Sequence, residues 1–380
     1  MTAKLNISIV GHKFMGKAHS NAYHKAARFF DLPCELVLKA ACGRHADQLN
    51  EFARNWGWEQ TQLSWQELVA RDDIDVVDIS SPTHTHKEIA IAAAQAGKHI
   101  FCEKPMALSA EEAREMYEAV EQAGVKHAIG FNYRRVPAIR LAKQMIEEGK
   151  LGDIYHWRGA YLQDWIVDPD FPLTWHLRQE TAGYGPHGDL NSHSVDLARY
   201  LVGEITSVQC TMANFIPERP LPDEAKETAF EAVASAGRGR VTVDDASFMV
   251  VRFANGALGS FEATRFASGR KNYNSFEIYG SKGSLCFNLE RLNELQVFSR
   301  DDAPSEQGFK TIMVTVASHP YIASWWPPGH IIGYEHTFVQ CIHDDVEMQP
   351  NFYDGLRCMQ VLDAGAESAR EGRTVDVPVA

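Results

Sequence analysis

Two patterns of apolar and polar positions alternate through the first third of the chain. Short apolar, β-rich runs have the length of buried strands and lie at residues 5–10, 35–42, 74–79 and 99–102. Longer helix-forming stretches lie between them, and glycine marks several of the junctions. Strands and helices that alternate at this spacing predict a doubly wound parallel sheet, with its ligand crevice at the carboxyl ends of the strands.

The pattern changes after residue 200, where β-rich segments follow one another without long helices between them. Turn signals separate these segments, which are residues 207–215, 246–253, 258–266, 274–280, 284–288 and 294–298. Residues 220–240 are polar and contain alanine and glycine, so we expect a mobile excursion there. Residues 335–341 and 353–369 have the pattern of closing helices. The second part of the chain is therefore predicted to be strand-rich.

Length and composition agree with two domains in a soluble globular protein. The chain has 380 residues, of which 45% are hydrophobic and 23% are charged. A net charge of −13 argues against a nucleic-acid partner. No apolar run has membrane-spanning length, and the N-terminus lacks a signal-peptide pattern. Because the seven cysteines form no CxxC pair, we expect free thiols and a cytoplasmic location.

A glycine turn follows the first apolar run. Gly11 and Gly16 stand between a predicted strand and a predicted helix, as in a dinucleotide-binding unit that holds a pyrophosphate. Lys13 occupies the place of the middle glycine, so this fingerprint alone is weak. The same residues match a P-loop up to Ala18, which has no hydroxyl group for Mg²⁺. This mismatch argues against nucleotide triphosphate hydrolysis.

The end of the second apolar run bears on the choice of nicotinamide cofactor. A dinucleotide fold usually places an acidic residue here for the ribose diol, whereas a nearby arginine can accept a 2′-phosphate. This chain has Gly43-Arg44 and no acid at that point. NADP therefore remains open beside NAD, although Arg44 could instead stack on the adenine.

Two loops at predicted strand ends carry candidate site residues. Residues 82–86 follow the third run, and Glu103-Lys104-Pro105 follows the fourth. A lysine after a buried strand and before proline is unusual for a solvated loop residue. Its ammonium group can hydrogen-bond a substrate oxygen and stabilise a developing alkoxide.

A second glycine-rich loop, residues 183–188, leads into an apolar-periodic segment. Asp189 is expected in the first turn of that helix, and His193 follows four residues later on the same helical face. Imidazole titrates near neutral pH, so His193 is the candidate base for a hydroxyl proton, with Asp189 orienting it or the hydroxyl. Taken alone, a capping aspartate and a surface histidine explain the pattern equally well.

These motifs together resemble the Gfo/Idh/MocA oxidoreductase family across essentially the whole chain. The resemblance rests on Glu103-Lys104-Pro105, on residues 130–135 (GFNYRR), and on the glycine loop with Asp189 and His193. Residues 14–20, 161–165 and 325–330 are most similar to the inositol, glucose and levoglucosan dehydrogenases of that family. The resemblance implies a Rossmann domain over residues 1–130. It also implies a substrate-binding and oligomerisation domain over 131–380, with a large, mainly antiparallel open sheet and helices on one face.

The family resemblance also implies a cofactor, a substrate class and two sets of site residues. We expect NAD as the cofactor, with NADP not excluded, and a cyclic polyol or pyranose as the substrate, scyllo-inositol first and glucose-type sugars next. Cofactor-binding residues are expected to be Gly11, Lys13, Phe14, Met15, Gly16, Gly43, Arg44, Ser81, Pro82, Thr83, His86, Glu103 and Lys104. Substrate-binding residues are expected to be Lys104, Tyr161, Asp164, Trp165, Arg178, Asp189, His193 and His319, with Lys104, Asp189 and His193 catalytic.

Other functions compete with this interpretation. His187, Asp189 and His193 have metal-ligand chemistry, but hydride transfer needs no metal and none is expected. A non-catalytic sensor would not need Lys104, Asp189 and His193 together. A levoglucosan-type 3-dehydrogenase, or a glycosidase that uses NAD transiently through C3 oxidation, would share every motif. For Arg178, a salt bridge to Glu180 is as well supported by the sequence as a contact with ring hydroxyls.

The second domain also predicts an assembly. Phe248, Val250, Phe261 and Phe266 are more apolar than a solvated sheet face tolerates, although alternation alone does not say which of them face the core. We expect a homotetramer, in which residues 319–330, rich in aromatics and proline, lie near a substrate pocket of the same or a neighbouring subunit.

Overall fold

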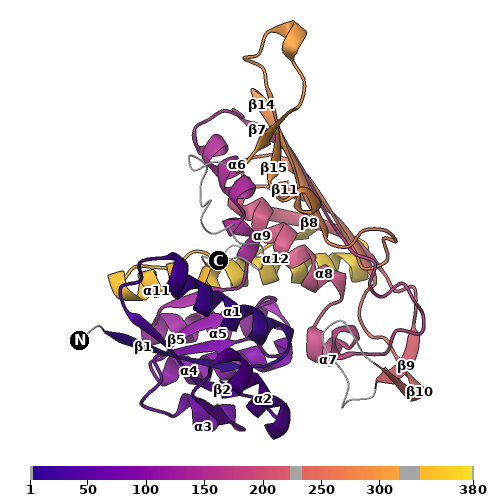
Figure 1. Cartoon of the computed structure of the whole chain (residues 1–380). Coiled ribbons are helices and arrows are strands. Elements are labelled where there is room, and N and C mark those ends of the chain that lie inside the picture. Colours follow the sequence, from indigo (N-terminus) through magenta and orange to yellow (C-terminus); the bar gives the residue numbers. More distant parts are fainter. Residues whose placement is uncertain (1–2, 223–232, 316–333, 379–380) are drawn as a thin grey trace.

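Two β-sheets organise the chain, one in each half (Figure 1). The computed structural model describes residues 3–222, 233–315 and 334–378. Within these ranges, no helix is long and apolar enough to cross a membrane.

The first sheet has six parallel strands in the order β3-β2-β1-β4-β5-β6. Its strands are β1 (Lys4–Val10), β2 (Glu35–Cys42), β3 (Gln60–Gln62), β4 (Val76–Ile79), β5 (His99–Cys102) and β6 (His127–Ile129). The helices between them are α1 (Phe14–Phe29), α2 (Ala46–Trp56), α3 (Trp65–Val69), α4 (His86–Gln95) and α5 (Ala110–Ala123). Every residue of β4 is buried, as expected of a parallel strand covered on both faces. The doubly wound prediction is confirmed.

The second sheet has nine strands in the order β16-β15-β14-β13-β7-β12-β11-β8-β17. Its strands are β7 (Ile154–Leu162), β8 (Ile205–Ala213), β11 (Ala246–Phe253), β12 (Leu258–Thr264), β13 (Tyr273–Gly280), β14 (Gly283–Asn288), β15 (Glu294–Ser299), β16 (Lys310–Met313) and β17 (Val375–Asp376). Only β12 and β7 pair in parallel among these strands, so the sheet is mainly antiparallel, as predicted.

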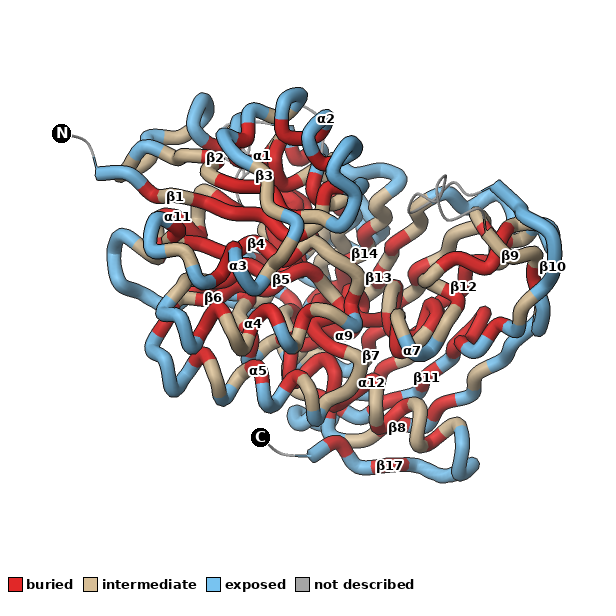
Figure 2. The backbone as a smooth tube through the Cα atoms, turned by 90° about the horizontal axis from the view of Figure 1, so that it is seen from below, coloured by how far each residue is buried: buried red, intermediate tan, exposed pale blue. Residues whose placement is uncertain are grey.

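Helices cover one face of this second sheet. They include α6 (Pro137–Glu147), α9 (Asn191–Leu201) and α12 (Phe352–Glu371), and α12 runs along the sheet beside β8 (Figure 1). Strand β11 alternates buried and exposed positions, with Met249 buried and Phe248 and Val250 exposed (Figure 2). Of the four aromatic and apolar residues expected to look outward, Phe261 is buried under the helices instead.

The C-terminal helices pack against the N-terminal sheet region as well as against the second sheet. Helix α11 (Tyr334–Asp344) lies on α1, and Phe338 contacts Phe101 edge to face at 5.8 Å between ring centroids. The first turn of α12 is tied to β6 by a hydrogen bond from the Phe352 amide to His127 Nδ1 at 3.1 Å. The chain therefore returns to its first half at its end. The predicted boundary at residue 130 stays a prediction; the last strand of the first sheet ends at Ile129.

The expected mobile excursion at residues 220–240 is ordered at both described ends. Strands β9 (Glu218–Pro222) and β10 (Ala234–Arg240) pair antiparallel in a separate two-stranded sheet. Arg219 is fully buried there and donates hydrogen bonds to the backbone carbonyls of Ile166, Asp168 and Phe171. The prediction is wrong for these ends, because the strands pair with each other and the buried Arg219 ties β9 to three backbone carbonyls.

Candidate active site

The glycine turn after β1 fits the pyrophosphate of a dinucleotide. Gly11 has a φ of 115°, and a Cβ there would lie 2.5 Å from the Ser80 carbonyl oxygen. A Cβ on Gly16 would lie 2.2 Å from the Gly11 carbonyl oxygen. Helix α1 begins directly after this turn and has no acidic residue in its first turn, so its N-terminal amides present a positive field. Lys13 and Phe14 are exposed beside it.

The loops after β4 and β5 are held together by His86. Its ring nitrogens lie 2.8 Å from the Ser81 carbonyl oxygen and 3.1 Å from the Pro105 carbonyl oxygen. Burial lowers the pKa of His86. Thr83 is buried between these loops, and the Ser81 hydroxyl contacts the Thr85 hydroxyl at 2.6 Å. His86 therefore links the loop after β4 to the loop after β5.

Glu103 faces the interior, where it meets residues that the sequence patterns did not single out. His19 lies 2.8 Å from Asp78 Oδ2 through Nδ1 and 3.0 Å from Glu103 Oε1 through Nε2. Burial alone would lower the pKa of His19, but the Asp78 and Glu103 carboxylates outweigh it and hold the pKa well above the usual value. Glu103 in turn accepts a hydrogen bond from the Lys104 backbone amide at 3.1 Å. The network thus fixes the loop that carries Lys104.

Lys104 and Asp189 meet at the crevice as an ion pair. Lys104 Nζ donates to Asp189 Oδ1 at 2.8 Å, and Arg265 Nη2 donates to Asp189 Oδ2 at 2.7 Å. Burial would raise the pKa of Asp189, yet the charges of Lys104 and Arg265 hold it well below the usual range. Arg265 was missed at the sequence level because it follows β12, about 75 residues after Asp189, and no local motif marks it.

The expected single helix carrying Asp189 and His193 is interrupted. Asp189 is the last residue of the one-turn helix α8 (Pro186–Asp189), and α9 begins at Asn191. His193 is buried, and its ring lies 4.5 Å from that of Tyr133 and 5.9 Å from that of Tyr161. The side chain of Asp189 pairs with Lys104 and Arg265, whereas the ring of His193 packs among tyrosine rings.

A hydrogen-bonded wall continues from His193 along the end of β7. The Tyr133 and Tyr161 hydroxyls lie 2.8 Å apart, and Tyr161 donates to Asn272 Oδ1 at 2.7 Å. Gln163 donates to the same oxygen, and Trp165 Nε1 donates to Gln163 Oε1. Tyr161 and Trp165 therefore lie in one hydrogen-bonded row that begins beside His193, and their part in substrate binding stays a prediction.

Asp164 stands between Gln163 and Trp165 in the sequence, but its carboxylate binds residues of the loop after β12. It accepts hydrogen bonds from Lys271 Nζ at 2.8 Å and from the Gly269 amide at 2.9 Å. The Lys271 hydrogen bond lowers the pKa of Asp164. This carboxylate orders the loop after β12.

The segment before the glycine loop adds a histidine that the sequence interpretation passed over. His176 stacks on Trp175 at 3.7 Å and contacts Trp165 edge to face at 5.8 Å. Burial, together with the charge of Arg265, lowers the pKa of His176 to about 3. Its Nδ1 has no hydrogen-bond partner among the described residues. His176 is therefore a neutral ring beside the Asp189 cluster, with a buried nitrogen that is unpartnered in the described part of the chain.

Three further residues weighed in the sequence analysis have different outcomes. Arg178 is half-buried, with its Nη1 3.9 Å from Glu180 Oε1, the alternative pairing foreseen for it. His187 is fully buried and contacts Ser247 Oγ and the Leu362 carbonyl oxygen, both at 2.8 Å, which leaves both of its ring nitrogens occupied. His319 and residues 325–330 lie outside the described ranges.

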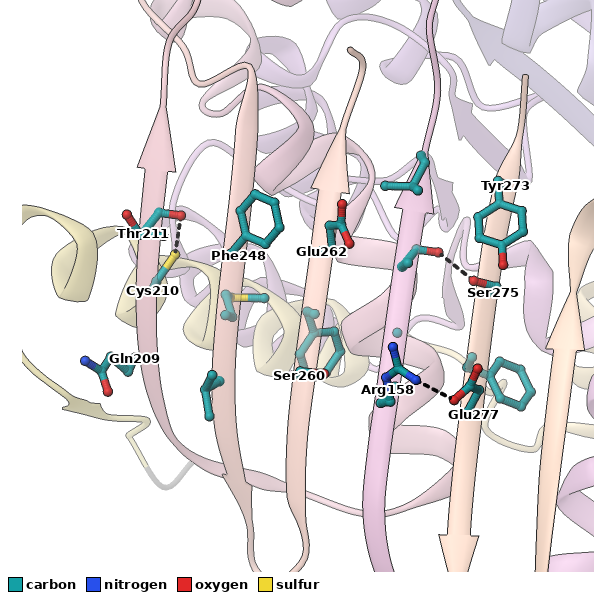
Figure 3. A pocket seen from close by; sticks show the side chains of 17 residues that line it. Arg158, Gln209, Cys210, Thr211, Phe248, Ser260, Glu262, Tyr273, Ser275 and Glu277 are labelled. Carbon is teal, nitrogen blue, oxygen red and sulfur yellow. Dashed lines mark hydrogen bonds and ion pairs between the residues drawn. The ribbon is translucent and has the colours of Figure 1, made fainter. Parts of the chain in front are cut away.

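A separate hollow lies on the outer face of the second sheet, away from this site. Figure 3 shows Phe248, Glu262 and the ion pair between Arg158 and Glu277, which join across 3.0 Å. Serine, threonine and glutamine side chains surround them on the neighbouring strands. The hollow mixes apolar and charged groups and contains none of the residues expected to bind cofactor or substrate.

Family models of known proteins match both the N-terminal and the C-terminal part of the chain. Residues 5–131 match the model of an oxidoreductase family with an NAD-binding Rossmann fold, and residues 139–286 match the GFO/IDH/MocA C-terminal domain. The chain is 45% identical to levoglucosan dehydrogenase of Pseudarthrobacter phenanthrenivorans, over 98% of each chain. It is 30% identical to scyllo-inositol 2-dehydrogenase (NAD(+)) of Bacillus subtilis, over 66% of this chain and 65% of that one.

Solved structures give the same picture. A levoglucosan dehydrogenase in complex with NADH and levoglucosan superposes with a TM-score of 0.91 and 44% identity, over 99% of this chain and 100% of that chain. An NAD-binding oxidoreductase from Klebsiella pneumoniae superposes with a TM-score of 0.89 and 36% identity, over 100% of both chains.

Proposed function

The chain belongs to the Gfo/Idh/MocA oxidoreductase family of NAD-dependent sugar and polyol dehydrogenases, and we propose that it oxidises one secondary hydroxyl of a levoglucosan-type pyranose. The observation that carries this proposal is the charged cluster of Lys104, Asp189 and Arg265 beside the buried ring of His193. It combines a cation for a developing alkoxide with an imidazole for the hydroxyl proton.

Each residue has a distinct part in the proposed reaction. His193 accepts the hydroxyl proton while the Lys104 ammonium group stabilises the oxygen that is left negative. Burial would lower the pKa of Lys104, but the carboxylate of Asp189 raises it, so Lys104 stays charged. Asp189 is itself held by Arg265, which fixes the direction of the Lys104 side chain.

The nicotinamide, when bound, supplies the acceptor for the hydride that leaves the carbinol carbon. Gly11, Gly16 and the N-terminus of α1 would hold its pyrophosphate. The alcohol loses a proton to His193 and a hydride to the cofactor, and the product is a ketone.

Two observations support the proposed substrate class: the aromatic residues near His193 and the sequence identities to known dehydrogenases. Rings of Tyr133, Tyr161 and Trp165 offer apolar faces edged by hydroxyl and amide groups, which suits a sugar ring. The levoglucosan dehydrogenase is 45% identical to this chain, against 26% and 30% for two inositol dehydrogenases. We therefore rank a levoglucosan-type sugar ahead of scyllo-inositol.

A substrate panel tests the proposal. Levoglucosan, glucose and inositols would each be incubated with NAD, with reduced cofactor followed by absorbance and the product identified by mass spectrometry. We expect net reduced cofactor and a ketone two mass units below levoglucosan. Cleavage of a glycoside without net reduction would instead support a glycosidase acting through transient oxidation. Faster turnover of scyllo-inositol would support the inositol alternative.

Lys104→Ala tests the mechanism. Loss of the positioned charge should lower kcat by about 100-fold or more, as for other preorganised donors to an oxyanion. Cofactor affinity, measured by fluorescence titration with NADH, should change little because the pyrophosphate site lies at the glycine turn. Lys87→Ala is the matched control, because Lys87 pairs with Glu115 on the helices outside the site. Near-normal turnover in Lys104→Ala would remove this role from the lysine.

Assembly is part of the proposal. The outer face of the second sheet exposes Phe248 and Val250 by 48% and 59%, and Tyr155 and Leu258 lie on the same sheet with 60% and 46% exposure. Apolar side chains that project from adjacent strands favour association of two such faces. We propose a homotetramer that uses this face.

A further inference from the structure

A row of hydrogen bonds connects Trp165 to Tyr133 through three intervening side chains. Three of its members lie at or just after the end of β7, one lies after β6 and one lies in the loop before β13: Tyr161, Gln163, Trp165, Tyr133 and Asn272. Trp165 Nε1 donates to Gln163 Oε1 at 2.8 Å, and Gln163 Nε2 donates to Asn272 Oδ1 at 3.0 Å. Tyr161 Oη lies 2.7 Å from that Asn272 oxygen and 2.8 Å from Tyr133 Oη. Between the two tyrosines, distance alone does not say which hydroxyl donates.

The direction of these bonds is fixed at the tryptophan end. An indole N–H group can only donate, so the carbonyl oxygen of the Gln163 amide must face Trp165 and its NH₂ group must face Asn272. An NH₂ group can also only donate, and Asn272 must therefore present its carbonyl oxygen. If the Asn272 amide were reversed, two NH₂ groups would face each other. The indole thus sets the orientation of the Asn272 amide through Gln163.

This orientation determines where the two tyrosine hydroxyls point. Because the Asn272 carbonyl oxygen only accepts, Tyr161 donates its one proton to it and must accept a hydrogen bond from Tyr133. Burial raises the pKa of Tyr133, so its hydroxyl keeps the proton that this bond requires. With that proton used, the Tyr133 oxygen can serve a ligand only as an acceptor.

The Tyr133 hydroxyl lies close to the proposed catalytic residues. The ring of Tyr133 lies 4.5 Å from that of His193. Besides the effect of burial, the charge of Lys104 lowers the pKa of Tyr133 and that of Asp189 raises it, which places both charged groups near its hydroxyl. Tyr133 is only 7% exposed, so a ligand group against its oxygen would be shielded from water. In such a place an acceptor that meets another acceptor is costly.

The loop that carries Asn272 is held by the protein itself. Glu290 Oε1 accepts hydrogen bonds from the Lys271 and Asn272 backbone amides at 3.1 and 3.3 Å. Glu290 Oε2 accepts a further bond from Arg270 at 3.2 Å. The Asn272 amide is therefore positioned before any ligand arrives.

We propose that Asn272 is a positioning residue for substrate selection: acting through Tyr161, it makes Tyr133 an acceptor, so that the site selects a sugar with a hydroxyl donor at that point. This donor is a hydroxyl other than the one oxidised, because the reacting hydroxyl gives its proton to His193. A fluorine, an ether oxygen or a carbonyl in its place would set two acceptors against each other. The inference rests on the proposed dehydrogenase function and adds a donor requirement to it.

Fluorinated sugars test the donor requirement. Fluorine replaces a hydroxyl at similar size but cannot donate a hydrogen bond. Levoglucosan is compared with analogues in which each hydroxyl other than the one oxidised is replaced by fluorine in turn; if another sugar or polyol proves to be the substrate, its fluorinated analogues are used. We expect kcat/KM of the wild type to fall about tenfold or more for one analogue, since the Tyr133 acceptor is left unpaired. If no analogue shows such a loss, the proposal is overturned.

Variants of Asn272 separate selection from structure. In Asn272→Leu the acceptor is gone, so Tyr161 can turn its proton to Tyr133, and the Tyr133 proton can turn to the fluorine. The loss caused by fluorine should then shrink at least about threefold, whereas Asn272→Asp keeps an acceptor and should keep the wild-type loss. The inductive effect of fluorine on hydride transfer is common to all variants and cancels in this comparison.

Asn255→Leu is the matched control, because Asn255 also makes side-chain hydrogen bonds but lies in the turn between β11 and β12, at the other end of these strands from Arg265. It should keep the wild-type ratio between levoglucosan and the fluorinated analogue. A merely structural role of Asn272 would lower kcat/KM for both sugars equally. An unchanged ratio in Asn272→Leu would therefore overturn the proposal.

Neutron diffraction from crystals of the deuterated protein tests the hydrogen-bond directions without any sugar. We expect the Tyr133 deuterium to point at Tyr161 Oη and the Tyr161 deuterium to point at Asn272 Oδ1. A Tyr161 deuterium that points at Tyr133 would overturn the proposal. Failure of every sugar as a substrate would refute the proposed function and leave this measurement intact. Conversely, the expected directions combined with an unchanged fluorine ratio in Asn272→Leu would refute the selective role of Asn272 and leave the dehydrogenase function standing.

Discussion

At the scale of single residues, the charged cluster sets the chemistry of the site. Each carboxylate oxygen of Asp189 accepts a hydrogen bond from a cation, one from Lys104 and the other from Arg265. One cation faces the crevice loop and the other is almost wholly buried. In the proposed reaction this arrangement separates two tasks, because Arg265 neutralises and orients the carboxylate and the Lys104 ammonium group serves the substrate oxygen.

His193→Asn tests the base. An amide of similar size keeps the packing against Tyr133 but cannot take a proton, so kcat should fall and the acid limb of the pH–rate profile should disappear. The measurement is kcat/KM against pH, with circular dichroism to establish folding. His343→Asn, an exposed residue on α11, serves as the control. If the profile keeps its acid limb, the proton passes to another group, with Asp189 or a water as the candidates.

Arg265→Leu tests the buried cation. Loss of one partner from a buried ion pair costs about 3–5 kcal/mol of stability, and Lys104 should keep the loss near the lower end. Because the pKa of Asp189 is depressed in the folded protein, its contribution is present above the ordinary carboxyl pKa and disappears as pH falls. Urea unfolding at pH 7 and at pH 3, below the ordinary carboxyl pKa of about 3.9, should therefore show a gap between wild type and variant that narrows at pH 3. A gap independent of pH would assign the loss to packing against Trp165.

At the scale of elements, the contact between α11 and α1 buries a carboxyl group. Glu335 lies in the first turn of α11 and is 4% exposed. Burial raises the pKa of Glu335 to about 8, and the neighbouring carboxylates of Asp78 and Glu103 add to the shift while His19 opposes it. The helix therefore docks on the His19 network with a protonated glutamate at neutral pH.

Glu335→Gln tests whether the buried carboxyl group of Glu335 is protonated at neutral pH. The folded protein holds a proton on Glu335 that the unfolded chain releases above its ordinary carboxyl pKa of about 4.3, so this group lowers stability as pH rises from there to about 8. The glutamine variant lacks that loss and should gain a few kcal/mol over wild type between pH 5 and pH 9, at about 1.4 kcal/mol per pKa unit. Urea unfolding across that range measures it. Glu118→Gln on α5, an exposed site, should track wild type, and a parallel curve for Glu335→Gln would refute the buried proton.

At the scale of the whole molecule, the second sheet divides two tasks between its faces. One face carries the helices that present Asp189 and His193, and the other exposes Phe248 and Val250 beside the hollow of Figure 3. A partner on the second face would lie on the opposite side of the sheet from Asp189 and His193.

Val250→Glu tests the assembly. A charge at the centre of an apolar contact between faces should shift the protein to smaller species in light scattering, since burying an unpaired carboxylate is costly. Leu63→Glu is the matched control, because Leu63 has the same 59% exposure but lies on the N-terminal half. A wild type that is monomeric and fully active at assay concentration would exclude this arrangement.

The sequence by itself determined the order of strands and helices and several residues of the crevice. The apolar pattern located β2, β5 and β11 to the residue, because β2 and β5 are apolar runs in a covered parallel sheet and β11 alternates between buried and exposed positions. Local motifs marked Gly11, Lys104 and Asp189, since a turn, a strand end and a helix start each leave a signature of a few residues.

Only the tertiary structure decided which distant residues meet these motifs. Arg265, His19 and Asn272 come from separate elements and have ordinary neighbours in sequence, so no periodicity distinguishes them. The start of α8 is likewise held by a distant residue, through the hydrogen bonds from the Gly185 and His187 amides to Asp244. Side-chain pairing across a fold is set by the packing of whole elements, and a linear pattern carries no record of it.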